Sequence, residues 1–444
     1  MSDIEVDERG YPSRRTAHYA LGLLTVAYIF AFIDRQILSL LVEPIRRDLQ
    51  ISDFQISLLQ GMAFALFYAL LGLPLGRLAD RFSRKWIVGA SIFFWSLMTA
   101  ACGLSRSFSA LFFTRMGVGI GEAGLSPAAY SLLSDYFPPA RLARALAIYT
   151  MGITVGGGLA YLVGGSVVEL VSVADAVSLP LIGQVQPWQV VFFIVGLPGL
   201  LLVPLVAFMT EPKRHGRLQE AGGAERETVP FTEVLHFVTS NRAIFLPLFS
   251  GASLLSVIGY GTLNWYPTFL IRTYGMNVGD IGLQFGLIYM VFGTLGAFGS
   301  AILSERLAQR GYSDANLRVV MLVGLALIVP AGLGPLMPTK YMALCCAAPT
   351  VMLLNAHLGV TVAALQQITP NQMRATVSAM MLFTTNILGL GLGAVVIASF
   401  TDFVFADDAA LRYSLAIVAG IVCPLAALCL RFTLLPFRTR LVRN

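Results

Sequence analysis

Long apolar runs recur along the whole chain, separated by short polar segments. Twelve of them approach or exceed the roughly 20 residues that an α-helix needs to cross a bilayer. They cover residues 17–42, 54–75, 87–105, 108–133, 143–170, 187–209, 243–271, 281–304, 317–337, 341–363, 374–400 and 410–435. They lack the short alternating pattern of a membrane β-strand. The pattern therefore predicts an all-α integral membrane protein with 12 transmembrane helices.

The longest polar segment, residues 210–242, divides these runs into two groups of six. It mixes both charges and contains Gly222 and Gly223, which is typical of a flexible or surface-lying linker. Two six-helix halves joined in this way are a pattern of secondary transporters. The predicted organisation is an N-terminal tail (1–16), a first half (17–209), the linker (210–242), a second half (243–435) and a C-terminal tail (436–444).

Composition and charge agree with a membrane protein and orient it. Of the 444 residues, 57% are hydrophobic and 12% charged, about half the charge of a soluble domain. Of the 30 Lys and Arg residues, 22 fall on the side of the N-terminus, 6 on the opposite side and 2 inside helices. Both termini are therefore predicted to be cytoplasmic. The net charge of +6 is explained by contact with anionic lipid headgroups, so no nucleic acid is expected as a partner. The polar first sixteen residues contain no signal peptide.

Two charged residues stand in the otherwise apolar stretch RMGVGIGEAG, residues 115–124. Arg115 and Glu122 are seven residues apart, which places them on one helix face about 10 Å apart along the axis. Asp34 lies beside Arg35 inside the first run. A charge at the bilayer centre costs about 2.5–3.5 kcal/mol on insertion scales, so such residues face a cavity or the bundle interior. We predict that Asp34, Glu122 and Arg115 couple transport to protons, and that Arg115 also contacts the substrate. An ion pair between Asp34 and Arg115 that only joins two helices is the structural alternative.

The second half has few buried charges and offers polar and aromatic side chains instead. Its predicted substrate contacts are Tyr260, Asn264, Trp265, Tyr289, Thr385 and Asn386. In GYGTLNWYP (259–267), Gly, Asn and Pro predict a broken helix of the kind that forms transporter binding sites. His357 is interpreted as a hydrogen-bonded packing residue. No catalytic motif, phosphate loop or metal-ligand spacing occurs, so we expect neither an enzyme nor a cofactor or metal.

Motifs in the first half resemble a known transporter family. GRLADRFSRK (76–85) is similar to the major facilitator signature, in which Gly76, Asp80, Arg81, Arg84 and Lys85 match while Ser83 replaces a preferred glycine. RMGVGIGEAGLSPAAYSLLSDYF (115–137) and AIYTMGITVGGGLAYLVGG (147–165) resemble the spinster lipid transporters within that superfamily. The detailed resemblance covers residues 25–165, and the second half agrees only in architecture. Ala160 and Tyr161 alter the superfamily's antiporter motif, which leaves the direction of transport open.

The resemblance implies a major facilitator fold that works by alternating access. It implies gating by Gly76, Asp80, Arg81, Arg84, Asp135 and Arg144, with a cytoplasmic charge network of Asp80, Arg81, Asp135 and Arg144. Spinster proteins move lysophospholipids or phosphorylated sphingoid bases, some with protons. We therefore expect a monomeric, proton-coupled lipid transporter of a bacterial inner membrane, whose partners are a lipid-like substrate, protons and the bilayer.

Two other interpretations remain open at this point. IDRQILS (33–39) also resembles the organic anion:cation symporters, so the cargo could instead be a small organic anion, or a drug, on the same fold. A non-transporting membrane receptor or enzyme is the alternative of another class. It is disfavoured because the chain offers neither a soluble output domain nor a catalytic motif.

Overall fold

The computed structural model describes residues 11–171, 177–179, 183–214 and 229–443, and nearly all of them are helical. The first part of the chain contains α1 (Arg14–Gln36), α2 (Val42–Leu49), α3 (Asp53–Ser57), α4 (Ala63–Arg81), α5 (Arg84–Cys102), α6 (Phe108–Glu122), α7 (Leu125–Tyr136), α8 (Pro139–Val171), α9 (Pro187–Gly196) and α10 (Leu202–Ala207). The remainder contains α11 (Phe231–Ser240), α12 (Arg242–Tyr274), α13 (Val278–Gln309), α14 (Ala315–Leu333), α15 (Lys340–Ile368), α16 (Arg374–Thr385), α17 (Leu392–Ser399) and α18 (Leu411–Arg443).

Short 3-10 and π-helical turns connect or interrupt these helices. The 3-10 turns are η1 (Ile37–Leu40), η3 (Leu197–Leu201), η4 (Gly334–Leu336), η5 (Asn371–Met373) and η8 (Asp408–Ala410). The π turns are η2 (Leu58–Met62), η6 (Asn386–Gly391) and η7 (Phe400–Phe405). A π turn inside a helix frees backbone groups and often marks a functional site.

Among the described residues, eleven helices are long and apolar enough to cross a membrane. The twelfth predicted span, 108–133, is present but divided into α6 and α7, so the expectation of one uninterrupted helix there was wrong. The break falls at Ala123 and Gly124, directly after Glu122. Pro127 belongs to the first turn of α7, where its missing N–H costs nothing. The twelve-span architecture is retained, with the interruption next to one of the two predicted acids.

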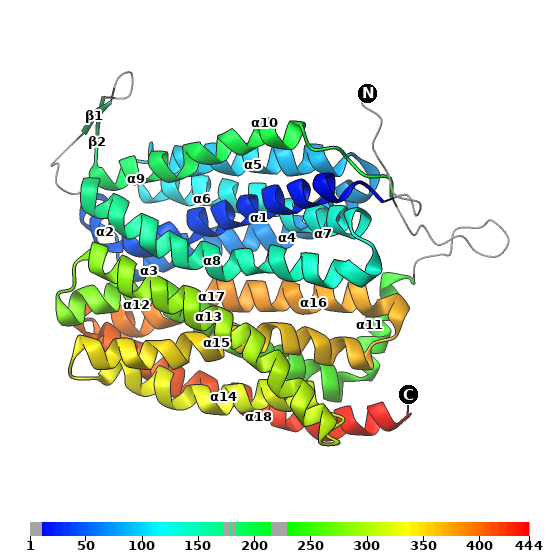
Figure 1. The fold of residues 1–444 in the computed structure, drawn as a ribbon. Coiled ribbons are helices and arrows are strands. Elements are labelled where there is room, and N and C mark those ends of the chain that lie inside the picture. Colours follow the sequence, from blue (N-terminus) through cyan, green and yellow to red (C-terminus); the bar gives the residue numbers. More distant parts are fainter. Residues whose placement is uncertain (1–10, 172–176, 180–182, 215–228, 444) are drawn as a thin grey trace. The chain divides into compact units, whose positions relative to one another are not determined.

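The chain folds as two units, each with its own core. The first contains residues 1–219 and 277–286, and the second contains 220–276 and 287–444. In the first unit α1 packs along α8, and α6 packs between α4 and α5. In the second, α18 packs against both α12 and α14. Figure 1 shows α1 beside α8 in the first unit and α14 beside α18 in the second.

One predicted helix break does not occur. α12 runs without interruption from Arg242 to Tyr274 and contains both Pro247 and Pro267. A Cβ atom on Gly261 would lie 2.8 Å from the Gly393 carbonyl oxygen. The glycine therefore lets α12 approach its neighbour in the second unit. In this half π turns occur instead at η6, which begins at Asn386, and at η7.

Two connections contain structure that the sequence patterns did not indicate. The segment between α8 and α9 includes an antiparallel hairpin of β1 (Val177–Leu179) and β2 (Gly183–Val185). The predicted linker includes α11, while its residues 215–228 lie outside the described part of the chain. The start of that segment is attached to the first unit, since Arg214 Nη2 donates to the carbonyl oxygens of Ala79 and Phe82 at 2.8 and 2.9 Å.

Candidate functional site

Four charged residues lie together in the interior of the first unit. Asp34 and Arg35 come from the end of α1, and Arg115 and Glu122 come from α6. All four are buried, with exposed fractions between 0% and 8%. The sequence predicted three of them as one group, and the structure brings those three and Arg35 to the same place.

Arg35 and Glu122 form a buried ion pair. Arg35 Nη2 donates to Glu122 Oε2 at 2.5 Å. The guanidinium also lies over the rings of Phe64 and Tyr68, 4.3 and 5.1 Å from their centroids. Aromatic faces attract a desolvated cation, so Arg35 has two kinds of favourable neighbour. The sequence indicated both charges but not their pairing, because 87 residues separate them.

Arg115 binds backbone instead of a carboxylate. Its Nε, Nη1 and Nη2 donate to the carbonyl oxygens of Leu59, Asp34 and Arg35 at 3.4, 3.1 and 3.4 Å. These carbonyls lie where helical bonding is interrupted, at the end of α1 and in the π turn η2. Arg115 therefore holds the end of α1 against η2, and the alternative of an Asp34–Arg115 ion pair was wrong.

The Asp34 carboxylate is buried without a hydrogen bond. Its residue is 1% exposed, and neither Oδ1 nor Oδ2 has a hydrogen-bond partner among the described residues. Trp95 Nε1 and Thr99 Oγ1 of α5 are the polar groups that approach this carboxylate, and neither has a partner at hydrogen-bond distance within the described part of the structure. A buried polar group without a partner is costly. Such groups in a native fold call for a functional explanation, and a proton is a ligand that this carboxylate can accept.

Glycines on α6 allow this group to assemble. A Cβ atom on Gly119 would lie 2.5 Å from the Phe64 carbonyl oxygen, and one on Gly121 would lie 2.7 Å from the Trp95 backbone nitrogen. Both distances are shorter than a side chain permits, so α6 approaches α4 and α5 only because these positions are glycine. The glycine-rich spacing around Arg115 and Glu122 thus has a packing role.

A second charge cluster surrounds Arg84 at the start of α5. Arg84 is 1% exposed. Its Nη1 pairs with the Asp135 carboxylate and donates to the Ser131 carbonyl oxygen at 3.1 Å. Its backbone N–H and Nε donate to Glu211 Oε1 at 2.8 and 3.2 Å. Glu211 was not predicted, because it stands in the polar segment taken as a linker.

Glu211 is held in its charged form. Burial alone would raise the pKa of its carboxyl, but hydrogen bonds from Ser83 Oγ and from the Arg84 N–H and guanidinium outweigh that effect and lower the pKa below its ordinary value. Glu211 and Asp135 together therefore compensate the buried guanidinium of Arg84.

The other predicted gating residues lie around this cluster. Gly76 on α4 lies beside Pro127, with 3.6 Å between its would-be Cβ and the proline Cβ. Arg81 and Arg144 are exposed, and the side chain of Asp80 lies outside the described part of the structure. The expected network of Asp80, Arg81, Asp135 and Arg144 thus stays a prediction. The described contacts place Arg84 at the centre of the cluster.

The predicted substrate contacts of the second half divide into two groups. Trp265 is fully buried and its Nε1 donates to the Ala394 carbonyl oxygen at 2.9 Å, so it packs within its own unit. Asn264 and Tyr289 are also buried. The partly exposed side chains are Tyr260, Thr385 and Asn386, the last two at the entry of η6. A role of these six residues in substrate binding stays a prediction.

His357 differs from its expected environment. It is buried in α15, but neither ring nitrogen has a hydrogen-bond partner among the described residues. The expectation of a hydrogen-bonded packing residue was therefore wrong for the ring, which is enclosed within that part of the structure without a hydrogen bond.

Comparison with known proteins identifies the family. Residues 24–394 match the Major Facilitator Superfamily. The chain belongs to that superfamily. It is 29% identical to an MFS-type efflux pump of Mycolicibacterium smegmatis, over 90% of this chain and 88% of that protein. It is 26% identical to the sphingosine-1-phosphate transporter SPNS2 of Danio rerio, over 84% of this chain and 74% of that protein.

A solved structure agrees with this assignment. A bacterial homologue of the lysosomal transporter spinster, in an inward-facing and unoccupied conformation, is 28% identical, with a TM-score of 0.80 over 97% of this chain and 99% of that one. The expected superfamily, the spinster resemblance and the all-α membrane fold are confirmed. The protein is a multi-pass membrane transporter and not an enzyme.

Proposed function

We propose that this superfamily member is a proton-coupled secondary transporter that works by alternating access as a monomer in the bacterial inner membrane, with both termini in the cytoplasm. Its proposed cargo is an amphipathic lipid with a phosphate-bearing headgroup, such as a lysophospholipid or a sphingosine-phosphate-like molecule. The observation that carries the proposal is the unpartnered Asp34 carboxylate, buried beside the Arg35–Glu122 ion pair. Intramembrane acids of this kind mark proton relays in transporters.

The ion pair suggests how a proton and a headgroup are linked. Arg35 donates to Glu122, and protonation of Glu122 removes the charge that holds the guanidinium. The Arg35 guanidinium then lacks its carboxylate partner and can bind a phosphate or carboxylate of the cargo, for which its planar donors are suited. Arg115 is the less suitable headgroup ligand because its nitrogens already donate to three carbonyl oxygens. We therefore add Arg35 to the predicted group of Asp34, Glu122 and Arg115.

The lipid cargo is supported by similarity and by the surroundings of Arg35. One relative is named as a sphingosine-1-phosphate transporter, and the rings of Phe32, Phe64 and Tyr68 surround the guanidinium. A cation among aromatic rings suits a molecule with an anionic head and an apolar body. A drug cargo is the second candidate, because another relative is named as an efflux pump. A small organic anion remains the third.

Transport in proteoliposomes tests the proposal. Purified protein is given a labelled lysophospholipid, with and without an imposed pH gradient, and wild type is compared with Glu122→Gln. Glu233→Gln is the matched control, since Glu233 is an exposed acid on α11 far from the site in sequence. We expect gradient-driven flux in wild type and control and its loss in Glu122→Gln.

The possible failures are distinguishable. If wild type transports the lipid equally well with and without the pH gradient, proton coupling is wrong and the lipid cargo is retained. If no lipid is transported but glucuronate or a cationic dye is taken up in response to the gradient, the lipid cargo is wrong and proton-coupled transport is retained.

A further inference from the structure

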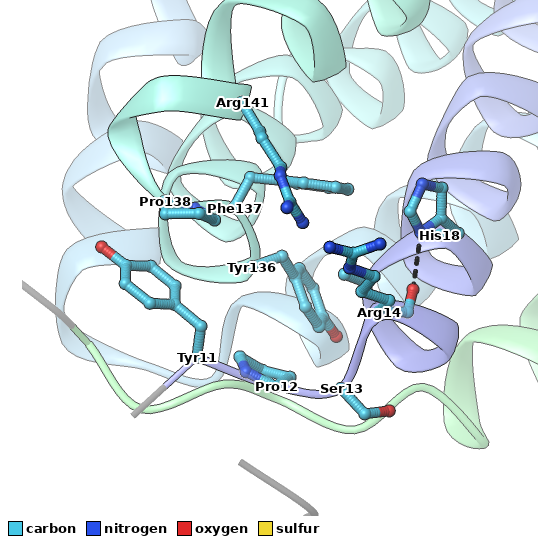
Figure 2. Close-up of a pocket in the computed structure, with 10 residues that line it drawn as sticks. Tyr11, Pro12, Ser13, Arg14, His18, Tyr136, Phe137, Pro138 and Arg141 are labelled. Atoms are coloured by element: carbon cyan, nitrogen blue, oxygen red, sulfur yellow. Dashed lines mark hydrogen bonds between the residues drawn. The ribbon is translucent and has the colours of Figure 1, made fainter. Parts of the chain in front are cut away.

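A cavity of about 480 Å³ lies at one end of the first unit, away from the transmembrane charges. Its walls come from the segment that enters α1 and from the turn that joins α7 to α8 (Figure 2). Its volume falls within the range of small-molecule sites, roughly 300–1,000 Å³. The end of the bundle where it opens is the one that the distribution of Lys and Arg predicts to face the cytoplasm.

The cavity is cationic. Arg14, the first residue of α1, and Arg141, in the first turn of α8, extend into it from separate elements (Figure 2). Within the described part of the chain, no carboxylate forms a salt bridge with either guanidinium. Two like charges that converge on one space repel each other unless an anion lies between them. The arrangement is therefore one that an anionic ligand would stabilise.

Backbone dipoles add to this field. α1 begins at Arg14 and α8 at Pro139, so two helix N-termini border the cavity. A helix N-terminus carries partial positive charge and favours anions, phosphate in particular. The two helices contribute one arginine each, so side-chain and backbone charge act in the same direction.

Aromatic side chains form part of the remaining walls. Tyr136 and Phe137 are buried, and the Tyr136 hydroxyl is already used because it donates to the Thr210 carbonyl oxygen. His18 is fixed at the edge, with Nδ1 donating to the Arg14 carbonyl oxygen at 2.6 Å and the ring edge-on to Phe137 at 5.7 Å. Beside these side chains, Arg14 and Arg141 supply permanently charged donors to the pocket.

We propose that this cavity binds a phosphate group, held between Arg14 and Arg141. The planar donors of arginine match phosphate oxygens in a bidentate manner, which a lysine cannot reproduce. The phosphate can come from the phosphomonoester headgroup of an anionic lipid in the adjacent leaflet, such as phosphatidic acid, or from a soluble phosphate ester. In either case it would bridge α1 and α8 and stabilise the first unit.

Thermal unfolding measures such a ligand directly, because a ligand that binds only the folded state raises the unfolding midpoint with its concentration. The soluble arm titrates detergent-purified full-length protein with inorganic phosphate at constant ionic strength, using chloride as the reference anion. The lipid arm compares protein in phosphatidylcholine nanodiscs with and without phosphatidic acid. The variants are R14Q/R141Q and, as matched control, R15Q, since Arg15 is an exposed neighbour that does not line the cavity.

We expect the midpoint of wild type to rise with phosphate in at least one arm, and the arm that responds identifies the source. R14Q/R141Q should weaken the apparent affinity at least about tenfold, through loss of charge-assisted hydrogen bonds, and R15Q should retain it. If the double variant does not fold, R141Q alone should weaken binding in the same direction. The proposal is overturned if the midpoint responds in neither arm. It is also overturned if R15Q loses as much apparent affinity as R14Q/R141Q, because that result shows only a general attraction of phosphate to a basic surface.

Discussion

At the scale of single residues, the transmembrane site is defined by how its four charges are satisfied. Arg35 and Glu122 form an ion pair, Arg115 donates to backbone carbonyl oxygens, and Asp34 has no hydrogen-bond partner among the described residues. A buried pair loses most when one partner is removed, because the other charge remains in a low-dielectric surrounding. The chemistry of the site therefore depends on which carboxylate takes up a proton, and on which contact is lost when it does.

Removal of Arg35 should destabilise the fold more than removal of the pair. R35Q leaves Glu122 buried without its counter-charge, and we expect the free energy of unfolding to fall by about 3–5 kcal/mol. R35Q/E122Q removes both charges and should recover a large part of that loss. Chemical unfolding of the single and double variants in detergent gives the coupling energy. Additive effects in this cycle would mean that the two residues do not interact.

Arg115→Lys should fail as a conservative change. The guanidinium reaches three carbonyl oxygens with three different nitrogens, whereas an ammonium group presents a single nitrogen. Each buried carbonyl that loses its donor costs about 1–3 kcal/mol. The unfolding midpoint of R115K, compared with that of R106K at an exposed arginine, measures the effect. Equal midpoints for the two variants would show that the carbonyl contacts contribute little.

At the scale of helices, glycine and helix ends determine how the charged groups meet. α6 approaches α4 and α5 through Gly119 and Gly121, and it ends directly after Glu122. The N-terminus of α5 is joined by Glu211 to the segment that follows α10. Both contacts place charges between elements that are distant in the sequence.

Substitution of Gly121 tests the close approach of α6. A Cβ atom there would lie 2.7 Å from the Trp95 nitrogen, so G121A forces two helix backbones apart, and we expect a cost of about 1–3 kcal/mol. G22A is the matched control, because a Cβ atom on Gly22 of α1 meets nothing within 4 Å. Thermal unfolding of both should show a loss only in G121A. A comparable loss in G22A would indicate a general requirement for helical glycine.

The Glu211 contact predicts an acid-dependent change in stability. The pKa of Glu211 is lower in the folded protein than its ordinary value of 4.5. Its contribution is therefore fully present above about pH 4.5 and is lost as the pH falls through the folded-state pKa. Unfolding midpoints measured across this acidic range should decline less steeply in E211Q than in wild type. E233Q, at an exposed acid of α11, should follow wild type, and an E211Q profile parallel to wild type would contradict the assignment.

The sequence predicts the membrane-spanning segments well and the contacts between distant residues poorly, for a physical reason. A membrane helix is a local property of some 20 apolar residues, and a charge inside such a run is visible without any neighbour. The partner of Glu122 is not visible, because Arg35 lies 87 residues away on another helix. The same limit explains Glu211 and Trp265, whose roles depend on what folds against them. α12 stays helical through Gly261 and Pro267, although the sequence alone reads both as break signals.

At the scale of the whole molecule, the question is how one carboxylate can shift the equilibrium between two conformations of a transporter built from two units. A ligand shifts such an equilibrium only by its difference in affinity for the two states. Asp34 lies within the first unit, at the point where α1 gives way to η1. A proton on this carboxylate changes the charge of the site without changing its shape. An asparagine side chain in place of Asp34 would be neutral at every pH and therefore imitates the protonated state permanently.

We predict that Asp34→Asn holds the transporter in one conformation. Spin labels at positions 106 and 338, exposed residues of the first and second unit, are introduced after the five native cysteines have been replaced. In wild type the distance distribution between them should change with pH, because protonation alters the population of the two states. In D34N it should consist of one population that no longer responds. Asp80→Asn, in the predicted gating motif, should shift the populations but keep their dependence on pH, because it leaves the proton site intact. A D34N distribution that still moves with pH would assign proton coupling to Glu122 instead.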